Sequence, residues 1–372
     1  MDNISEFDIK LEKDIYYAGE MIRGHVVLHT TENFKLRSMR LSLRSQAHVE
    51  WKILVSGDRR NVKDDQYFVD ERIVVWGHDT SDGPIPILPR GKHQFPFTFK
   101  LPESSLPCSF ESRTGYIRYY VKATVDRPYA SPPQGLKYFT LIGPHIDCMD
   151  EQYLKPMIGT EVRTSCCFCC RRNPVELSAQ LERSAYVCGE SIKLRASIDN
   201  KGVEKAWLSV KLTQYLEFFI ERGVLGTSRE LQKVVMEYKG EPVPPGTAIK
   251  WDSSKKMILP VCPPTLVGVC RLIQIYYVLK VSVQLEKSGE DMQMHFPLTV
   301  ATVPFRIPNL TQQPQIKYEN AMEHVEGGCY IGPEFLLGQV YDGTEPLGSQ
   351  APLVLYRPVY VCIANEKKTQ SR

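Results

Sequence analysis

The chain has 372 residues, 42% of them hydrophobic and 24% charged, proportions typical of a soluble globular protein large enough for two cores. The net charge of +3 includes no long run of Lys or Arg, which argues against nucleic acid as a partner. No stretch approaches the roughly 20 apolar residues of a membrane helix, and the first residues lack the features of a signal peptide. The eleven cysteines are an odd number and four crowd into 166–170, unlike a secreted disulfide framework, so we expect a cytoplasmic protein with reduced thiols.

Two stretches of the chain, 170 positions apart, are nearly the same, and further matches follow in the same order. Four matches in one order predict a β-domain that is built twice. The first match is Leu11-Glu12-Lys13, Tyr16, Gly19-Glu20 and Ile22 with Leu181-Glu182-Arg183, Tyr186, Gly189-Glu190 and Ile192. The others are Leu41-Ser42-Leu43 with Leu208-Ser209-Val210 at an offset of 167, then Leu101-Pro102 with Leu259-Pro260 and Tyr119-Tyr120-Val121-Lys122 with Tyr277-Val278-Leu279-Lys280, both at 158.

Apolar and polar residues alternate along most of the chain. In one run, Ile192, Leu194, Ala196 and Ile198 point one way, and the polar residues between them point the other way. Such strands bury one face and expose the other, as in antiparallel sheets. We therefore predict an all-β fold of two tandem immunoglobulin-like antiparallel sandwiches, residues 1–150 and 174–307.

The offset between matched residues falls from 170 to 158 along the chain. The first copy therefore has 12 more residues than the second between Leu11 and Leu101. Residues 56–60 and 80–84 have the polar turn chemistry of longer loops, where we place the extra residues. Alternation lapses at 151–173, which we interpret as a cysteine-rich linker between the domains. Residues 308–372 are expected to be an extended C-terminal tail with short linear motifs.

One segment of the first copy resembles a known family. It runs from Phe95-Pro96-Phe97-Thr98-Phe99-Lys100-Leu101-Pro102 through Leu106-Pro107-Cys108-Ser109-Phe110-Glu111 to Gly115-Tyr116-Ile117-Arg118-Tyr119-Tyr120-Val121-Lys122 and Asp126-Arg127-Pro128. It is similar to the end of the N-terminal arrestin-like domain of the α-arrestins, the arrestin domain-containing proteins. Residues 186–200 resemble the opening strands of their second arrestin-like domain, and a cysteine-rich linker is also typical of the family.

The resemblance implies a non-enzymatic adaptor in endocytosis and membrane trafficking, without a cofactor. The arrestin body engages cytosolic segments of membrane cargo such as receptors and transporters. Pro-Pro-x-Tyr motifs in the tail recruit WW domains of HECT-type ubiquitin ligases, and ubiquitinated cargo moves to endosomes. We therefore expect a cytoplasmic protein that is recruited to the plasma membrane and endosomes, with peripheral membrane association.

The tail departs from this family pattern, because no Pro-Pro pair is followed by Tyr at the required place. The nearest match is Arg357-Pro358-Val359-Tyr360, which lacks the first proline of a polyproline segment that a WW groove binds. The overlapping Tyr356-Arg357-Pro358-Val359 fits a tyrosine-based sorting signal. These five residues are the candidate WW or sorting motif.

The cysteine cluster Cys166, Cys167, Cys169 and Cys170 permits four interpretations. The two-residue gaps suit zinc, but no second pair of ligands follows, so we expect no metal. Arg171 and Arg172 would place lipidated thiols at an anionic membrane surface. The same arginines would lower a thiol pKa for redox sensing. The fourth interpretation is a structural linker that packs small apolar thiols.

Lys10 and Lys13 flank the first predicted strand. In receptor-binding arrestins, basic residues near that strand contact receptor phosphates, so we consider both lysines candidate contacts to cargo or its phosphates. We find no catalytic set of residues and expect no enzyme. Two other functions remain open: a thioredoxin-linked redox regulator, like one α-arrestin, and a coat subunit like the retromer subunit that shares the arrestin fold.

Overall fold

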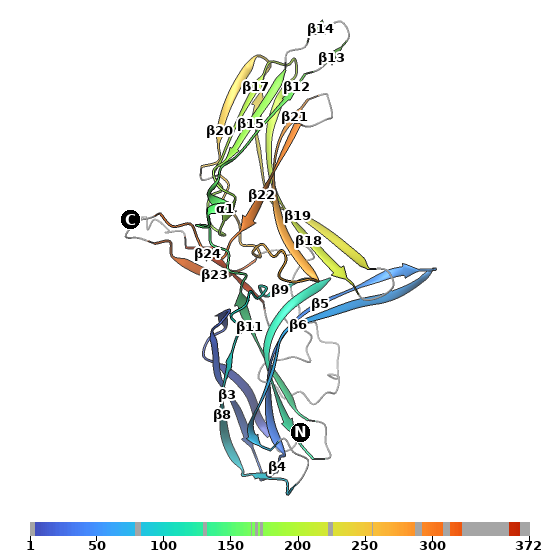
Figure 1. Cartoon of the computed structure of the whole chain (residues 1–372), viewed down its shortest axis with the longest axis vertical. Coiled ribbons are helices and arrows are strands. Elements are labelled where there is room, and N and C mark those ends of the chain that lie inside the picture. The colour runs from blue at the N-terminus through green and yellow to red at the C-terminus, as the bar shows by residue number, and fades with distance from the viewer. Residues whose placement is uncertain are drawn as a thin grey trace.

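The computed structural model contains two β-sandwiches placed end to end, with the hairpins of both projecting from one side at the middle of the molecule (Figure 1). It describes residues 4–78, 83–128, 132–164, 166–167, 170–171, 174–221, 226–254, 256–286, 292–307, 313–321 and 357–364. The predicted all-β fold and the tandem arrangement are confirmed.

The first sandwich packs a three-stranded antiparallel sheet against a larger one. The smaller sheet has the order β1 (Ile4–Leu11), β3 (Met21–Thr30), β8 (Gly91–Lys100). The larger sheet has the order β2 (Ile15–Tyr17), β11 (Gln134–Ile142), β10 (Gly115–Asp126), β5 (Ser38–Val55), β6 (Asp58–Gly77), and β9 (Phe110–Glu111) pairs with β10. A separate pair joins β4 (Phe34–Lys35) to β7 (Ile87–Leu88).

The second sandwich repeats this plan and adds one edge strand. Its smaller sheet has the order β12 (Met157–Arg163), β15 (Val175–Leu181), β17 (Leu194–Asn200), β20 (Thr247–Asp252). Its five-stranded sheet has the order β16 (Ala185–Tyr186), β22 (Met292–Val300), β21 (Ile273–Leu285), β18 (Ala206–Ile220), β19 (Thr227–Val243). The remaining elements are α1 (Glu151–Leu154), β13 (Cys166–Cys167), β14 (Cys170–Arg171), β23 (Ile316–Asn320) and β24 (Val359–Ile363).

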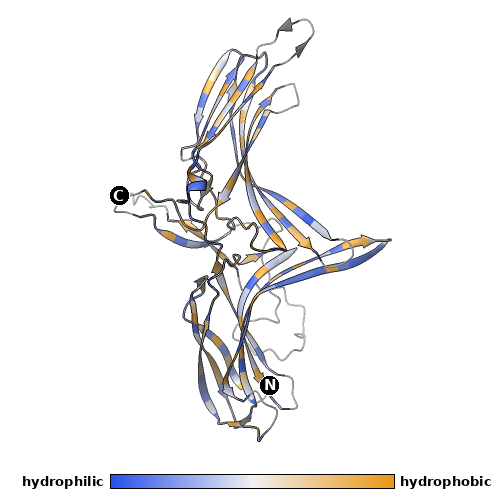
Figure 2. Cartoon of the chain, viewed as in Figure 1, coloured by the Kyte–Doolittle hydropathy of each residue, from blue (hydrophilic) through white to orange (hydrophobic). Residues whose placement is uncertain are grey.

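The core follows the alternation of the sequence. Strand β10 alternates between buried and half-buried residues along its whole length, and Figure 2 shows hydrophobic and hydrophilic residues alternating along the strands. Tyr119 of β10 and Tyr277 of β21 are both buried, and each hydroxyl donates to a proline carbonyl, of Pro107 at 2.8 Å and of Pro263 at 2.5 Å. This shared bond confirms the offset of 158 for these strands.

The duplication is also confirmed at the first matched stretch, where each copy turns a corner. Gly19 and Gly189 both have positive φ, +80° and +86°. Glu20 accepts a hydrogen bond from the backbone N–H of Tyr17, as Glu190 does from that of Val187, each at 2.9 Å. Positive φ favours glycine, which explains why this residue recurs.

The offset of 167 for the Leu41-Ser42-Leu43 match is wrong by two residues. Val121 pairs with Leu43, and its counterpart Leu279 pairs with Leu212, so the offset for β5 and β18 is 169. A slip of two residues keeps every side chain on the same face, so the apolar pattern alone could not detect it.

The expectation of a longer loop at residues 56–60 is also wrong. Strands β5 and β6 form a long hairpin closed by Ser56-Gly57, a two-residue turn in which both residues have positive φ. Most of the extra residues lie instead between β6 and β8: residues 78–90 connect Gly77 to Gly91, whereas only 244–246 connect β19 to β20. The second predicted loop, residues 80–84, lies within this longer connection. Residues 79–82 of the connection are outside the described residues.

Residues 151–173 differ from the expected linker, because β12 lies inside them. It pairs antiparallel with β15 from Met157↔Leu181 to Arg163↔Val175, as an edge strand of the second sandwich. The side chains of Ile158 and Val162 on this strand face solvent, 73% and 55% exposed. Apolar residues usually mark the buried face of a strand, so the sequence pattern did not reveal β12. The second sandwich therefore begins before the cysteine cluster.

Candidate functional site

A fully buried carboxylate joins the two sandwiches. Asp64 of β6 has no exposed surface, and Arg271, just before β21, approaches its Oδ1 with Nη2 at 3.4 Å. Arg271 also donates from Nη1 to Glu221 at 3.0 Å and from its backbone N–H to Gln66 Oε1 at 3.0 Å. Because a buried carboxylate without a cation is costly, this contact fixes the β5–β6 hairpin against the second sandwich.

A second, smaller core lies where the sandwiches meet, and the tail covers it. Strands β23 and β24 pair antiparallel into a ribbon, which lies beside the junction (Figure 1). The hydroxyls of Tyr17 and Tyr318 are 2.8 Å apart, and the N–H of Ile363 donates to the carbonyl of Cys188 at 2.8 Å. The buried members of this core come from both sandwiches, the connecting segment and the tail: Ile142, Ile146, Cys148, Ala185, Val187, Ala301 and Val361. The tail ribbon thus helps to hold the sandwiches in one arrangement.

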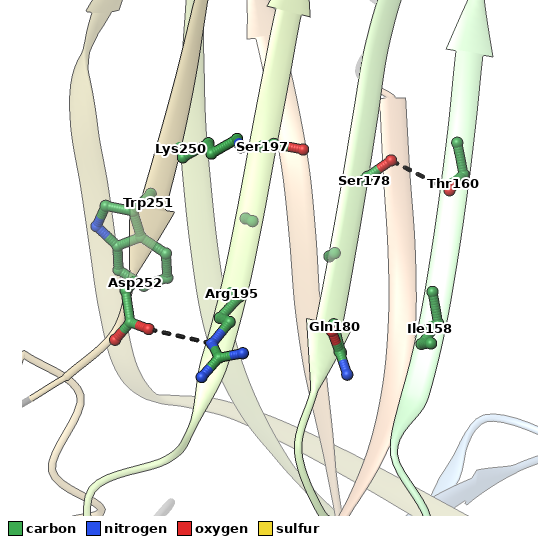
Figure 3. A pocket seen from close by; sticks show the side chains of 11 residues that line it. Ile158, Thr160, Ser178, Gln180, Arg195, Ser197, Lys250, Trp251 and Asp252 are labelled. Carbon is green, nitrogen blue, oxygen red and sulfur yellow. Dashed lines mark hydrogen bonds and ion pairs between the residues drawn. The ribbon is translucent and has the colours of Figure 1, made fainter.

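The outer face of the β12–β15–β17–β20 sheet carries an open hollow of about 460 Å³ (Figure 3). Thr160 and Ser178 hydrogen-bond across two strands at 3.1 Å, and Arg195 forms an ion pair with Asp252 at 3.4 Å. Small side chains occupy its middle and Ile158 lies at its rim. These lining residues include no paired nucleophile and base, so the hollow suits contact with another molecule better than chemistry.

The described part of the chain offers neither a metal site nor a membrane-spanning helix. No three His, Cys, Asp or Glu side chains in that part of the chain are arranged to hold a metal ion. No helix within it is long and apolar enough to cross a membrane.

Comparison with known proteins identifies the family. The arrestin (or S-antigen) N-terminal domain matches residues 5–147, and the arrestin (or S-antigen) C-terminal domain matches 171–305, one for each sandwich. The relatives include arrestin domain-containing protein 4 of Mus musculus, 27% identical over 79% of this chain and 70% of the relative. The chain belongs to the α-arrestins.

Other relatives agree with this assignment. Arrestin domain-containing protein 17 of Caenorhabditis elegans is 27% identical over 82% of this α-arrestin and 72% of its own length. Thioredoxin-interacting protein of Pongo abelii is 22% identical over 77% and 71%. Arrestin-family proteins are generally non-enzymatic adaptors, and the similarity supports an adaptor-type role for this α-arrestin.

The two candidate lysines near the first strand have different surroundings. Lys10 is exposed on β1, opposite His25. Lys13 donates to both oxygens of Glu20 at 2.8 Å and lies 4.9 Å from the ring centre of Tyr16. Lys13 is therefore engaged at the corner of the sandwich, whereas Lys10 presents its charge to solvent. Their role toward cargo or phosphate stays a prediction.

The cysteine cluster lies at the far end of the second sandwich, away from the junction (Figure 1). Strands β13 and β14 form a short hairpin, with Cys166 opposite Arg171 and Cys167 opposite Cys170. Cys169 and Arg172 are outside the described residues. Because the cluster is remote from the first sandwich, its position does not favour the interpretation as a structural linker between the domains. Lipidation and redox chemistry of these cysteines stay predictions.

The candidate tail motif lies partly in strand β24. Tyr356 is outside the described residues, and Arg357 donates to the carbonyl of Ala321. Pro358 is buried and Tyr360 is only 2% exposed. These are the two residues that a WW groove would read, so β24 must leave its place before such a groove can bind them. This burial could not be predicted from the sequence, because the apolar run Val359–Ile363 fits a motif and a strand equally well.

A group of buried thiols lies outside the predicted cysteine cluster. Cys188 and Cys262, distant in sequence, have their sulfur atoms 4.0 Å apart under the tail ribbon. Burial raises the pKa of Cys108 to about 12 and that of Cys362 to about 11, so thiolates are disfavoured there. The described free cysteines, all of them buried, are Cys108, Cys148, Cys188, Cys262, Cys270 and Cys362.

Proposed function

We propose that this α-arrestin is a non-enzymatic adaptor that binds cytosolic segments of membrane proteins and links them to endocytic sorting and ubiquitination. The observation that carries the proposal is the joined pair of arrestin sandwiches. Asp64–Arg271 and the tail ribbon hold two extended sheet faces and two long hairpins in a fixed relation. Such a frame is suited to gripping another polypeptide.

The proposed location is the cytoplasm, with recruitment to the plasma membrane and endosomes. The test is surface biotinylation of cells with and without the chain. We expect a subset of membrane proteins to accumulate at the surface, with less ubiquitin attached, when the chain is absent. Reintroducing the chain should reverse both effects. An unchanged surface proteome would contradict the proposal.

Recruitment of a WW-domain ligase through Pro358 and Tyr360 depends on undocking of β24. We expect a synthetic peptide of residues 352–365 to bind isolated WW domains more tightly than the intact chain does. The change Tyr360→Ala in the peptide should abolish that binding. If neither form binds, the ligase must be recruited elsewhere on the chain.

A thioredoxin-linked redox role is the second candidate, favoured by the 4.0 Å approach of the Cys188 and Cys262 sulfur atoms. The relative called thioredoxin-interacting protein supplies the partner to test. After a mild oxidant such as oxidised glutathione has joined the two thiols in a disulfide, a thioredoxin variant that cannot resolve its mixed disulfide should be trapped by the parent chain and not by Cys262→Ser. Both thiols are buried and must be uncovered before thioredoxin can react with them; if the parent chain is not trapped, this role is excluded and the adaptor role stands.

A further inference from the structure

Strand β12 is an edge of the smaller sheet in the second sandwich. It pairs with β15 through all seven of its residues without a bulge, and no strand in the described part of the chain pairs with its other side. Figure 3 shows β12 as the last strand of the sheet, beside the hollow. The row of backbone groups along such an edge can pair with a further strand.

The outer face of β12 carries no charge. Its side chains there are Ile158, Thr160 and Val162, and the two apolar ones are both more than half exposed. The charged residues of the strand, Glu161 and Arg163, belong to the other face, because successive side chains of a strand alternate. The edge therefore presents two β-branched apolar side chains to water, a feature that favours pairing with another strand.

The other edges of the two smaller sheets are protected. Strand β1 carries Asp8 and Lys10 on the face opposite to its buried residues. Strand β20 exposes Lys250 and Asp252, and β8 contains the exposed Pro96. Charge and proline are the devices by which edge strands avoid pairing with other chains. The outer face of β12 has neither.

Two copies of β12 are complementary to each other in one register. A two-fold axis through Thr160, perpendicular to the sheet, would pair all seven residues antiparallel, with Met157 of one copy opposite Arg163 of the other. Ile158 would then stand opposite Val162 twice, both times on the outer face. A slip of two residues in either direction breaks both apolar pairs, and a slip of one residue turns one copy's side chains to the other face. The strand itself thus specifies the register.

We propose that β12 pairs antiparallel with β12 of a second copy of this chain and so joins two four-stranded sheets into one. The match between Ile158 and Val162 across the axis carries the proposal, which does not depend on the adaptor function. A strand of seven residues makes a small interface, so we expect a dissociation constant of roughly 10–100 µM. Two joined chains would bind clustered partners with greater avidity than one chain does.

The direct test is analytical ultracentrifugation of the full chain from about 1 to about 200 µM. A reducing agent is present throughout, which excludes disulfide-linked pairs. We expect a reversible equilibrium between monomer and dimer. The variant Ile158→Lys/Val162→Lys places lysine opposite lysine at two points of the interface and should raise the dissociation constant about tenfold or more. A chain that is monomeric at every concentration would overturn the proposal.

A matched control and a rescue test the specificity. Val203 and Val267 are also exposed and lie outside β12, and Val203→Lys/Val267→Lys should stay within twofold of the parent chain. The variant Ile158→Glu/Val162→Glu should not associate with itself but should associate with Ile158→Lys/Val162→Lys, because opposite charges then face each other. An equal loss in the control, or a mixture that does not associate, would overturn the proposal.

Cross-linking tests the position of the two-fold axis. In Thr160→Cys the new thiol lies on the axis, where the Cα atoms of an antiparallel pair are about 4.5–5.5 Å apart, a distance that suits a disulfide. Oxidation in air with copper–phenanthroline should link this variant into dimers. Ser178→Cys, on the neighbouring strand β15, should give no more dimer than the parent chain, whose own cysteines set the baseline. If Thr160→Cys also gives no excess, the proposal fails.

Folding and other occupants of the edge are checked in parallel. The melting temperature of Ile158→Lys/Val162→Lys at about 1 µM should equal that of the parent chain, because both side chains are exposed in a single copy. Slow deuterium exchange of the β12 amides at every concentration would mean that a segment of the same chain covers the edge. Capture of another protein by a chain that stays monomeric, lost in the same variant, would assign the edge to that protein. Either result would overturn the proposal.

Discussion

The same corner motif occurs in both sandwiches, and its surroundings differ. In the first, Lys13 and Glu20 form an ion pair at 2.8 Å with side chains 48% and 35% exposed. In the second, Arg183 and Glu190 form the corresponding pair at 3.0 Å, and each side chain is only 10% exposed. Duplication preserved the geometry of the corner but not its burial.

The junction between the sandwiches explains the difference. Arg183 lies 4.1 Å from the ring centre of Tyr186 and 4.7 Å from that of Phe305, which follows the second sandwich. At the first corner the tail meets the hydroxyl of Tyr17 through Tyr318, but the side chains of Lys13 and Glu20 stay 48% and 35% exposed, so water screens their charges. The ion pair of this motif therefore contributes little to stability in the first copy and more in the second, where neighbouring residues bury it.

Removing the carboxylate should give the largest difference in stability loss between the two corners. Glu190→Gln leaves the charge of Arg183 uncompensated in a buried place and should lower the free energy of unfolding by about 3 kcal/mol. Glu20→Gln removes an exposed pair and should cost at most about 1 kcal/mol. Urea unfolding followed by fluorescence measures both. Equal losses would mean that burial at the junction does not strengthen the second corner.

The glycines of the two corners should also differ. Alanine at either position is strained by the positive φ, which costs about 1 kcal/mol. In Gly189→Ala the new Cβ would also lie 2.9 Å from the carbonyl oxygen of Ile363 and 3.0 Å from Sγ of Cys362, both in β24. In Gly19→Ala it would meet the flexible side chain of Glu103 at 3.3 Å and the Cα of that residue at an ordinary 3.9 Å.

We therefore expect Gly189→Ala to loosen the tail ribbon as well as to lower stability. Limited proteolysis should cut the C-terminal region of Gly189→Ala several times faster than that of Gly19→Ala or the parent chain. Unchanged cutting would show that β24 does not depend on the space beside Gly189.

The buried tyrosines give the smallest contrast. Tyr119→Phe removes one hydrogen bond, to Pro107, and should cost about 1 kcal/mol. Tyr277→Phe removes the bond to Pro263 and also leaves the buried amide of Gln214, which donates to Tyr277 at 2.8 Å, without that acceptor. We expect about 2 kcal/mol for Tyr277→Phe. Calorimetry of the two variants measures both losses. A loss for Tyr119→Phe as large as that for Tyr277→Phe would contradict the role given to Gln214.

Much of the fold could be predicted from the sequence, because period-2 alternation and the repeated Tyr-x-x-Gly-Glu corner report local geometry. The same reasoning failed at β12, whose exposed Ile158 and Val162 invert the usual pattern. It also failed at 56–60, where a long hairpin replaces the expected loop. Length and polarity of a turn do not reveal how far its flanking strands extend.

The candidate sites were less accessible to sequence reasoning. The burial of Tyr360 depends on a partner strand more than 40 residues earlier, Ile316–Asn320, and on Cys188 in the second sandwich. The contact between Asp64 and Arg271 joins residues 207 positions apart, so no local motif marks it. Such a site becomes visible only when the packing of the two sandwiches is known.

The measurement that tests the central claim most directly is proximity labelling in intact cells, with a biotin ligase fused to the full chain. We expect labelling of membrane proteins through their cytosolic segments, together with endocytic and ubiquitination machinery. Stable labelling of a fixed set of coat subunits, or of soluble enzymes alone, would contradict it.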